Sequence, residues 1–371
     1  MLEKRVGFFR VDKFLLRVLQ LSLIVLLFTS TIAVATFDSA GRTNKALSSP
    51  GISQGINSGY QLVQFPLPNG SSAPFAIASD HSGTIWVAEQ GSNQIGSFDP
   101  VTHFFKEYSI PTPNSGLSSI SVDNESNVWF TELNSNNLGE LRDGTVKEYG
   151  VPGAILSVGG KNQEQSCGPT AALADSFDHI WVICIFSNQI DEFFPTNKSF
   201  LIFNLPVFQS GPAGLVFDNN GGFWFTAADA AMIGHGVVSQ LVNGTSDGIT
   251  EFPPLNDSYI FNFQESTSFL GNTKNVESSL PTPSGIALSP DGNTLWISEH
   301  VDSSFDSFNI QTKSFDRFWT SKTNNAFGYP VSLPNGIVVD PLGIVWVAEH
   351  YGNKIAEFNP ANNEMVEYNV P

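Results

Sequence analysis

Two histidines occupy matching places in the last two copies of a repeated motif. His300 and His350 each fall four residues after a tryptophan, and each directly follows a glutamate, Glu299 or Glu349. Imidazole titrates near neutral pH and binds metals, and carboxylates ligate divalent cations. On neighbouring units of a repeat fold, these four side chains would form a small metal or acid/base catalytic cluster. The competing interpretation is a pair of exposed loop histidines that serve no site.

Glutamate ends the same motif in two earlier copies, at Glu89 and Glu132. Equivalent positions in a ring of repeats lie at equal heights near one face, so these carboxylates would converge with Glu299 and Glu349. Such a group would hold Mg²⁺ or Ca²⁺, the one cofactor class that the sequence indicates. The alternative is that each glutamate bonds to the turn amides of its own unit.

Six tryptophans mark the units that must position these residues. An aspartate precedes each tryptophan by six residues, or by five in the fifth copy, and the tryptophans are 43, 52, 43, 72 and 50 residues apart. A period of roughly 40–50 residues is typical of β-propeller blades. The sequence therefore predicts an all-β propeller of four-stranded antiparallel blades with six recognisable repeats. The motif cores are Ile85–Glu89, Val128–Glu132, Ile180–Cys184, Phe223–Ala227, Leu295–Glu299 and Val345–Glu349.

Each unit divides into four short strands. Strand A is a short apolar run, strand B carries the tryptophan, and strand C follows an asparagine turn. Strand D alternates apolar and polar residues and ends in proline. A further strand of the D type, Gln61–Pro66, precedes the first unit. Two closures are therefore open: six blades close with a spare strand, or the ring is built for seven and its last A, B and C strands are absent. Residues 255–282 form an insertion that is too short for a whole blade.

The N-terminal part of the chain has the pattern of an export segment. Basic residues within positions 1–17 precede an apolar run, and Ala33-Val34-Ala35 then supplies a cleavage signature. Residues 1–36 are predicted to form one hydrophobic helix that is a signal peptide or a signal anchor. Residues 37–59 are predicted to be a flexible linker and residues 60–371 the propeller. This organisation predicts an extracellular or cell-surface protein that touches the membrane only through its N-terminal segment.

Charge narrows the choice of partners. The chain has 17 basic and 35 acidic residues and a formal net charge of −18. Nucleic acid is therefore excluded as a partner, because its phosphates require basic patches. A small molecule or an extracellular protein is the expected partner, and the chain is expected to be a monomer.

The two cysteines fall in the third unit. Cys167 lies just before its first strand, and Cys184 ends its second strand. These strands form a tight hairpin, so the start of one faces the end of the next. Outside the cytosol this arrangement predicts a Cys167–Cys184 disulfide. The alternative is two free buried thiols.

The consensus of the units resembles the virginiamycin B lyase (streptogramin lyase) family over about residues 60–371. The matching patterns are P-x-G-I in strand A, D-x-x-G-x-[IV]-W-[VF]-[AT]-E through strand B, N-[QK]-I-G in strand C and E-Y-x-[IV]-P in strand D. The resemblance implies a seven-bladed, magnesium-dependent enzyme that opens a cyclic depsipeptide antibiotic by elimination. It also implies catalytic histidines at the variable position of P-x-G-I in the last two blades. That position holds Phe75, Ala213, Ser284 and Asn335, and the second and third copies are irregular at Leu117 and Thr170.

The missing histidines set the functional prediction. We expect an exported or membrane-anchored propeller that binds a ligand or a protein and lacks the lyase catalytic histidines. The alternative is a divalent-metal-dependent C–O lyase, or a lactonase or hydrolase, that acts at one face through His300 and His350. The sequence leaves open whether the protein is an enzyme, and bound metal is the observation that would discriminate.

Overall fold

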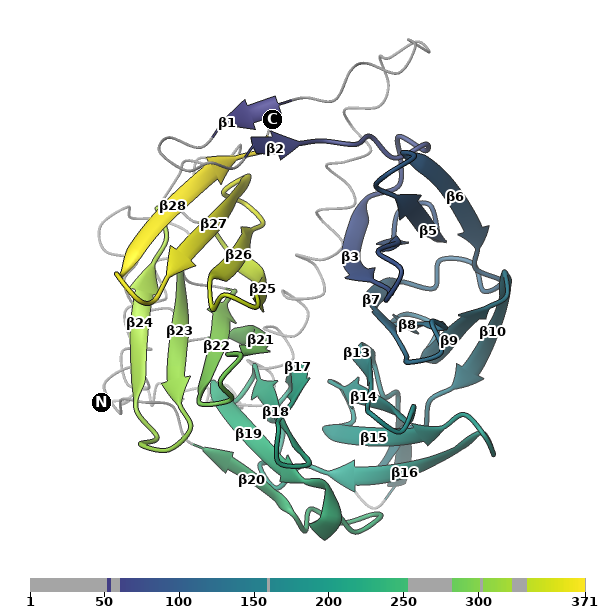
Figure 1. Ribbon diagram of the computed structural model, residues 1–371. Helices are drawn as coiled ribbons and strands as arrows, with labels where there is room; N and C mark the ends of the chain where they lie inside the picture. The colour runs from purple at the N-terminus through teal and green to yellow at the C-terminus, as the bar shows by residue number, and fades with distance from the viewer. Residues whose placement is uncertain are drawn as a thin grey trace, which may run out of the picture.

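The computed structural model describes residues 52–54, 61–158, 161–252, 282–300, 303–321 and 332–370. Within them, six four-stranded antiparallel sheets follow one another around a ring (Figure 1). The predicted all-β propeller with six blades is thus confirmed. The predicted N-terminal helix lies outside the described residues, as does nearly all of the insertion at 255–282. No helix in the described part of the chain is long and apolar enough to cross a membrane.

The strands of each blade run in order from the inside of the ring to its rim. Blade 1 comprises β3 (Pro74–Ser79), β4 (Ile85–Glu89), β5 (Gln94–Asp99) and β6 (Phe104–Ser109). Blade 2 comprises β7 (Leu117–Val122), β8 (Val128–Glu132), β9 (Asn137–Arg142) and β10 (Thr145–Gly150). Blade 3 comprises β13 (Pro169–Ala174), β14 (Ile180–Cys184), β15 (Gln189–Phe194) and β16 (Ser199–Asn204).

The other three blades repeat the same order. Blade 4 comprises β17 (Pro212–Phe217), β18 (Gly222–Ala227), β19 (Met232–Val237) and β20 (Ile249–Phe252), with the short 3-10 helix η2 (Val238–Gln240) after β19. Blade 5 comprises β21 (Pro283–Leu288), β22 (Thr294–Glu299), β23 (Ser304–Asn309) and β24 (Phe315–Trp319). Blade 6 comprises β25 (Pro334–Val339), β26 (Val345–Glu349), β27 (Lys354–Asn359) and β28 (Glu364–Asn369).

The aspartate that precedes each tryptophan in the repeat closes the turn between the first two strands of a blade. In blade 2, one oxygen of Asp123 accepts the backbone N–H groups of Glu125 at 3.0 Å and Asn127 at 2.8 Å. Its other oxygen accepts the indole N–H of Trp129 at 2.8 Å. The carboxylate thus closes the turn and fixes the ring that packs between blades. The same indole bond forms in blades 1, 3 and 6, from Trp86 to Asp80, from Trp181 to Asp175 and from Trp346 to Asp340.

The core of the protein lies between blades. In one such cluster, Ala88 and Ile95 of blade 1 pack with Ile120 and Phe130 of blade 2. Further buried clusters join blades 2 and 3, 3 and 4, 4 and 5, and 5 and 6. Each blade therefore buries its two faces against its neighbours, and removing these apolar surfaces from water is the main source of stability.

The junction between blade 6 and blade 1 is different. No buried cluster joins these two blades among the described residues, and β25 and β3 do not pack together as the other neighbouring inner strands do (Figure 1). Ile77 of β3 is 70% exposed, whereas its equivalent Ile120 is 8% exposed. Val338 of β25 is 60% exposed, whereas its equivalent Ala287 is 9% exposed. The ring is therefore open at this junction.

The spare N-terminal strand does not complete a blade. β2 (Gln61–Val63) pairs with β1 (Ile52–Gln54) in a separate two-stranded sheet, which falls partly in the predicted linker. This sheet lies at the rim between β28 and β6 (Figure 1), and the nearby ring of Phe65 packs on Phe98 of blade 1 at 4.9 Å. The β1–β2 sheet thus lies on the outside of the open junction.

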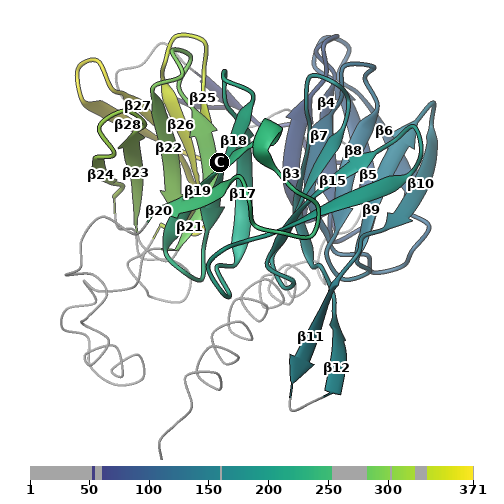
Figure 2. The same ribbon diagram turned by 90° about the horizontal axis from the view of Figure 1, so that it is seen from below.

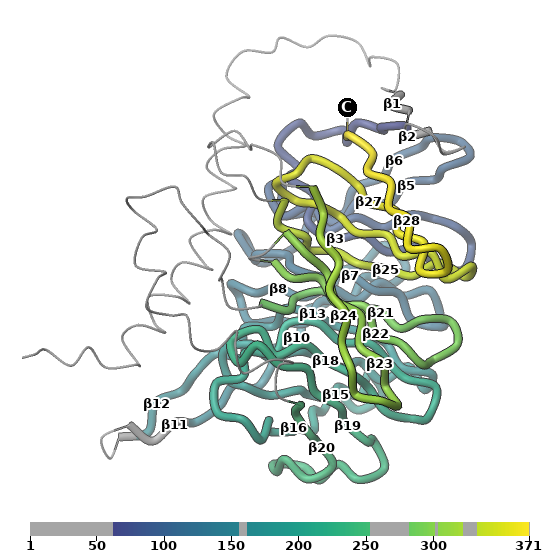
Figure 3. Tube along the Cα trace, turned by 90° about the vertical axis from the view of Figure 1, so that its left-hand side faces the viewer, coloured from purple at the N-terminus to yellow at the C-terminus, as the bar shows by residue number. Residues whose placement is uncertain are grey.

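One further element was not anticipated from the sequence. The chain between blades 2 and 3 forms a hairpin of β11 (Ala154–Val158) and β12 (Lys161–Gln165). Figures 2 and 3 show this hairpin projecting away from the ring on one side. It accounts for the longer tryptophan spacing between the second and third motifs.

Candidate functional site

The two predicted histidines lie side by side. β22 and β26 end at Glu299 and Glu349, and His300 and His350 begin the turns that follow. The two imidazole rings are nearly parallel, with an interplanar angle of 17° and 6.2 Å between their centroids. The sequence therefore places two imidazoles and two carboxylates on adjacent blades, as the motif predicts.

His300 joins two blades. The His300 backbone N–H donates to the Thr282 carbonyl, at the start of the same blade, at 3.0 Å. The His300 ring is hydrogen-bonded to the backbone of Pro334, the first residue of β25 in the next blade. The equivalent residue of blade 1 does the same, because the Gln90 amide donates to the carbonyl of Leu117, the first residue of β7, at 2.8 Å. In blades 1 and 5 the residue at this position thus ties its blade to the next inner strand.

Both imidazoles are kept neutral. Burial, together with the neighbouring His350, lowers the pKa of His300 to about 4. Burial also lowers the pKa of His350 below its usual value. Neutral imidazole is the form that ligates a metal or accepts a proton, so the pair keeps that capacity at neutral pH.

The four predicted glutamates are buried in separate blades. Glu89 accepts the Ser92 hydroxyl at 2.9 Å, and Glu132 accepts the Ser135 hydroxyl at 2.6 Å. Both serines belong to the turn of the same blade, so these two carboxylates bond within their own unit through serine side chains. The described residues contain one group of three or more closely spaced metal-ligating side chains, and it includes none of these glutamates.

Burial, with a smaller contribution from second acids on the outer strands, raises the pKa of two of these glutamates. Burial, with a contribution from nearby Glu148, raises the pKa of Glu132 to about 7. Burial and the charge of Glu367 raise the pKa of Glu349 to about 8. Glu367 itself accepts the Lys354 ammonium at 2.7 Å. At neutral pH the Glu349 carboxyl therefore holds a proton that it can donate.

Glu349→Gln is expected to make folding stability less dependent on pH. The folded protein keeps the Glu349 proton up to about pH 8, whereas the unfolded chain loses it near the ordinary value of 4.5. Stability should therefore fall as pH rises between these values, by up to about 1.4 kcal/mol per pH unit for this one proton. Urea unfolding of wild type and variant at pH 5, 7 and 9 measures the slope. Equal slopes in the two proteins would contradict this assignment.

The group that the sequence missed lies in blade 3. Asp175, His179 and Glu192 offer ligand atoms that all lie within 4.8 Å of one another. Glu192 lies on β15 opposite Trp181, and His179 precedes that tryptophan by two residues. A histidine at this place in the motif, facing an acid on the next strand, was the signal available in the sequence.

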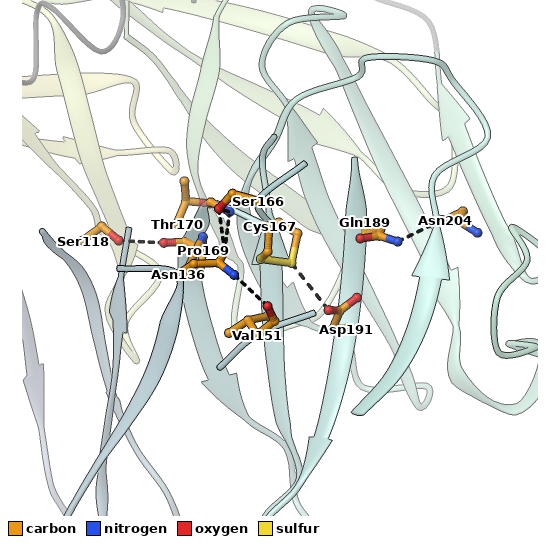
Figure 4. The surroundings of a disulfide bond; sticks show 12 residues. Ser118, Asn136, Val151, Ser166, Cys167, Pro169, Thr170, Gln189, Asp191 and Asn204 are labelled. Atoms are coloured by element: carbon orange, nitrogen blue, oxygen red, sulfur yellow. Dashed lines mark hydrogen bonds between the residues drawn. A yellow bond between two sulfur atoms is a disulfide. The ribbon is translucent and has the colours of Figure 1, made fainter. Parts of the chain in front are cut away.

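The predicted disulfide is confirmed. Cys167 and Cys184 are bonded across the start of β13 and the end of β14, and both are fully buried (Figure 4). Cys184 takes the place that glutamate holds in four other blades, and the acid of blade 3 is instead Asp191 on β15. Burial raises the Asp191 pKa well above its usual value. Its Oδ2 atom lies 3.6 Å from the Cys184 sulfur, which carries no proton because it is part of the disulfide.

In blades 5 and 6, the backbone carbonyl at the variable position of the inner strand accepts a hydrogen bond from the preceding blade. The Thr226 hydroxyl donates to the Ser284 carbonyl at 2.8 Å, and the Ser298 hydroxyl donates to the Asn335 carbonyl at 2.6 Å. In both cases a side chain of one blade holds the inner strand of the next. No histidine occupies this position in any of the six blades.

Comparisons with known proteins agree with this architecture. Residues 52–157 match the Virginiamycin B lyase family, and residues 214–371 match the SMP-30/Gluconolactonase/LRE-like region. Virginiamycin B lyase from Staphylococcus aureus is 21% identical with a TM-score of 0.64, over 82% of this chain and 87% of that chain. A streptogramin B lyase structure gives the same identity and TM-score, over 82% and 85%.

A more distant structure shares the fold as well. A proposed 6-phosphogluconolactonase from Bacteroides fragilis is 12% identical with a TM-score of 0.56, over 85% of this chain and 92% of that chain. No curated protein sequence matches the chain. At these identities the solved structures establish the shared fold. Together with the match at residues 52–157, this shared β-propeller fold supports the resemblance read from the repeat, so the chain is similar to virginiamycin B lyases.

Proposed function

We propose that this chain is an exported or cell-surface propeller that binds a partner protein and does not catalyse the lyase reaction. The observation that carries the proposal is the open junction between blades 6 and 1. Its two apolar faces, marked by Val338 and Ile77, are the kind of surface that every other junction buries. Exposed apolar faces of this kind mark interaction sites.

Polar contacts at the junction support the same conclusion. Elsewhere, the asparagine between strands B and C clamps a serine of the next blade: Asn93 accepts the Ser115 N–H and hydroxyl, both at 2.9 Å. Asn188 accepts the same two groups of Ser210 at 2.8 and 2.9 Å. At the open junction, the Asn353 side chain bonds only the Val370 carbonyl of its own blade among the described residues. The acceptor of this clamp is therefore available to an incoming chain.

A second contact repeats between neighbouring blades, and blade 1 contains the acid that makes it. Glu148 accepts the Thr112 N–H at 2.9 Å, and Glu251 accepts the Val207 N–H at 2.7 Å. Each of these N–H groups belongs to the loop that follows the preceding blade. The equivalent acid of blade 1 is Glu107. One oxygen of Glu107 is buried and has no hydrogen-bond partner in the described part of the chain. A buried acceptor without a partner is costly, so this face is suited to receive a donor.

The geometry selects one kind of occupant. A second copy of the chain could place its own blade 1 against blade 6 of the first copy. With the usual geometry between neighbouring blades, the two rings would then share one axis, and the remaining blades of the second copy would collide with the first ring. The occupant must therefore be a single blade-sized antiparallel sheet that is apolar on both faces. We assign it to a partner protein that supplies such a sheet at the cell surface.

A tethered blade tests the proposal. A copy of residues 113–152, which span blade 2, is appended after Pro371 through a flexible linker, so that its effective concentration at the junction is high. We expect the fusion to unfold at a higher temperature than the original chain. Ile77→Asp or Val338→Asp in the fusion should cancel the gain, whereas Val101→Asp, on an exposed turn of blade 1, should leave it unchanged. A fusion with no gain, or a gain that survives both junction variants, would overturn the proposal.

The second candidate is a divalent-metal-dependent C–O lyase, lactonase or hydrolase. It is favoured by the stacked His300–His350 pair, which lies in the part of the chain that matches the gluconolactonase-like region. The adjacent carboxyls of Glu299 and Glu349 would hold Mg²⁺ or Ca²⁺. Calorimetry on chelator-stripped protein decides this case. Binding of either ion that disappears in the His300→Ala/His350→Ala variant would favour the enzyme.

A further inference from the structure

We propose that Asp175, His179 and Glu192 of blade 3 form a binding site for a divalent transition-metal ion of the Zn²⁺ class. The site is built on the turn between β13 and β14 and on the adjoining strand β15. It is independent of the open junction and of the His300–His350 pair, so it stands or falls separately from the proposed function.

The spacing of the ligand atoms fits one ion. The Nδ1 atom of His179 lies 2.8 Å from Oε1 of Glu192 and 3.7 Å from Oδ2 of Asp175. Zinc ligands lie about 2.0–2.2 Å from the metal, so two of them are at most about 4.4 Å apart. Both distances fall inside this limit, and all three ligand atoms lie within 4.8 Å of one another. Three protein ligands leave a coordination position for water, as in open zinc sites.

The first ligand is held in place before any ion binds. Oδ1 of Asp175 accepts the backbone N–H groups of Phe177 at 2.8 Å and of His179 at 3.0 Å. Oδ2 accepts the Trp181 indole N–H at 3.0 Å, and a carboxylate oxygen has a second lone pair for a metal. A ligand oriented by such bonds loses little freedom on binding.

The other two ligands are fixed by packing. The His179 ring lies against Phe194, with 4.4 Å between ring centroids, and Glu192 is buried on β15. His179 stays partly exposed, so solvent and ions can reach the site.

The other blades show that the three-ligand set is not required by the fold. Blade 4 has the equivalent aspartate and a ligand on strand C, with Asp218 Oδ2 and His235 Nε2 2.8 Å apart, but Gly222 stands at the place of His179. Blade 2 has Asn127 at that place, where its amide bonds Asp123 at 2.8 Å. Blade 3 alone, among the described residues, combines three ligands. Blade 4 is thus a natural two-ligand control.

The ligand types select the metal. Imidazole with carboxylates suits Zn²⁺, Cu²⁺ and Ni²⁺, whereas Mg²⁺ and Ca²⁺ prefer all-oxygen sites. His179 must be deprotonated at Nδ1 to bind, so the ion replaces the hydrogen bond to Glu192.

The test uses the full chain, freed of any histidine tag and stripped with chelator. Co²⁺ is added as a spectroscopic probe, and Zn²⁺ is used to displace it. We expect one equivalent of Co²⁺ with visible absorption bands, displacement by Zn²⁺, and quenching of Trp181 fluorescence. His179→Ala and Glu192→Gln should each weaken binding at least tenfold, while His235→Ala should not change it.

Each other outcome counts against the site. Wild-type protein that takes up no Co²⁺, or binding that is unchanged in both blade 3 variants, would sink the proposal. Binding that is lost in His300→Ala/His350→Ala but kept in His179→Ala would move the metal to the other face. Circular dichroism and thermal unfolding of His179→Ala and Glu192→Gln establish that each variant is folded before its binding is compared.

Discussion

Asp123→Ala is expected to lower the free energy of unfolding by about 3–5 kcal/mol, because several buried donors lose their acceptor together. Asp123 is almost fully buried. It accepts two backbone N–H groups, the Asn127 amide and the Trp129 indole. Without the carboxylate, the turn between β7 and β8 loses its closure, and the indole N–H at the interface of blades 2 and 3 has no acceptor.

Asp291→Ala is the matched control. In the fifth motif the aspartate precedes the tryptophan by five residues instead of six, and the structure shows the consequence. Asp291 is exposed and bonds Ser289 and Asn293 within the turn. Its loss is expected to cost less than about 1 kcal/mol. Chemical unfolding of both variants measures the difference, and similar losses would show that the tryptophan bond does not set the effect.

The repeat made the fold predictable because its period reports a physical unit. A motif in which an aspartate closes a turn onto a tryptophan needs a hairpin, and its recurrence needs neighbours that cover both faces of each sheet. The asparagine turns follow from the same logic: Asn93, Asn136, Asn188 and Asn353 all adopt positive φ, which asparagine tolerates. Local chemistry of this kind is visible in one unit of the sequence.

Contacts between units were not visible in the same way. The sequence marked His300 and His350 as candidates because no other blade has histidine at this position. The structure shows that Gln90 makes the equivalent bridge to the next inner strand. The role belongs to the position, and two different side chains perform it. A pattern of residue types cannot reveal this, because the shared feature is the carbonyl of the neighbouring blade that each ring or amide reaches.

The open junction is likewise a feature of the contacts between units. Counting strands left two closures possible, because a D-type strand precedes the first unit and another ends the last. The structure pairs β2 with β1 and leaves Ile77 and Val338 exposed. Each of these residues is ordinary within its own strand. Only its comparison with Ile120 or Ala287 in a closed junction shows that a neighbour is missing.

Removing the disulfide is the second large effect that we expect. The bond joins positions 17 residues apart. A loop of about this length constrains the unfolded chain by about 3 kcal/mol in the entropic account. The Cys167→Ser/Cys184→Ser variant should therefore lose about that much stability. It also places two hydroxyls in a fully buried space beside Asp191, which adds to the loss.

Because the disulfide is buried, its rate of reduction provides a second test of this prediction. Both sulfur atoms are inaccessible in the folded chain, so a thiol reductant can reach them only when blade 3 opens. We expect the native protein to resist reduction in buffer and to be reduced rapidly in denaturant at concentrations near its unfolding midpoint. Wild type unfolded with and without reductant should reproduce the difference seen with the serine variant. Rapid reduction of the native protein, or equal midpoints for the two proteins, would mean that the bond does not hold blade 3 together.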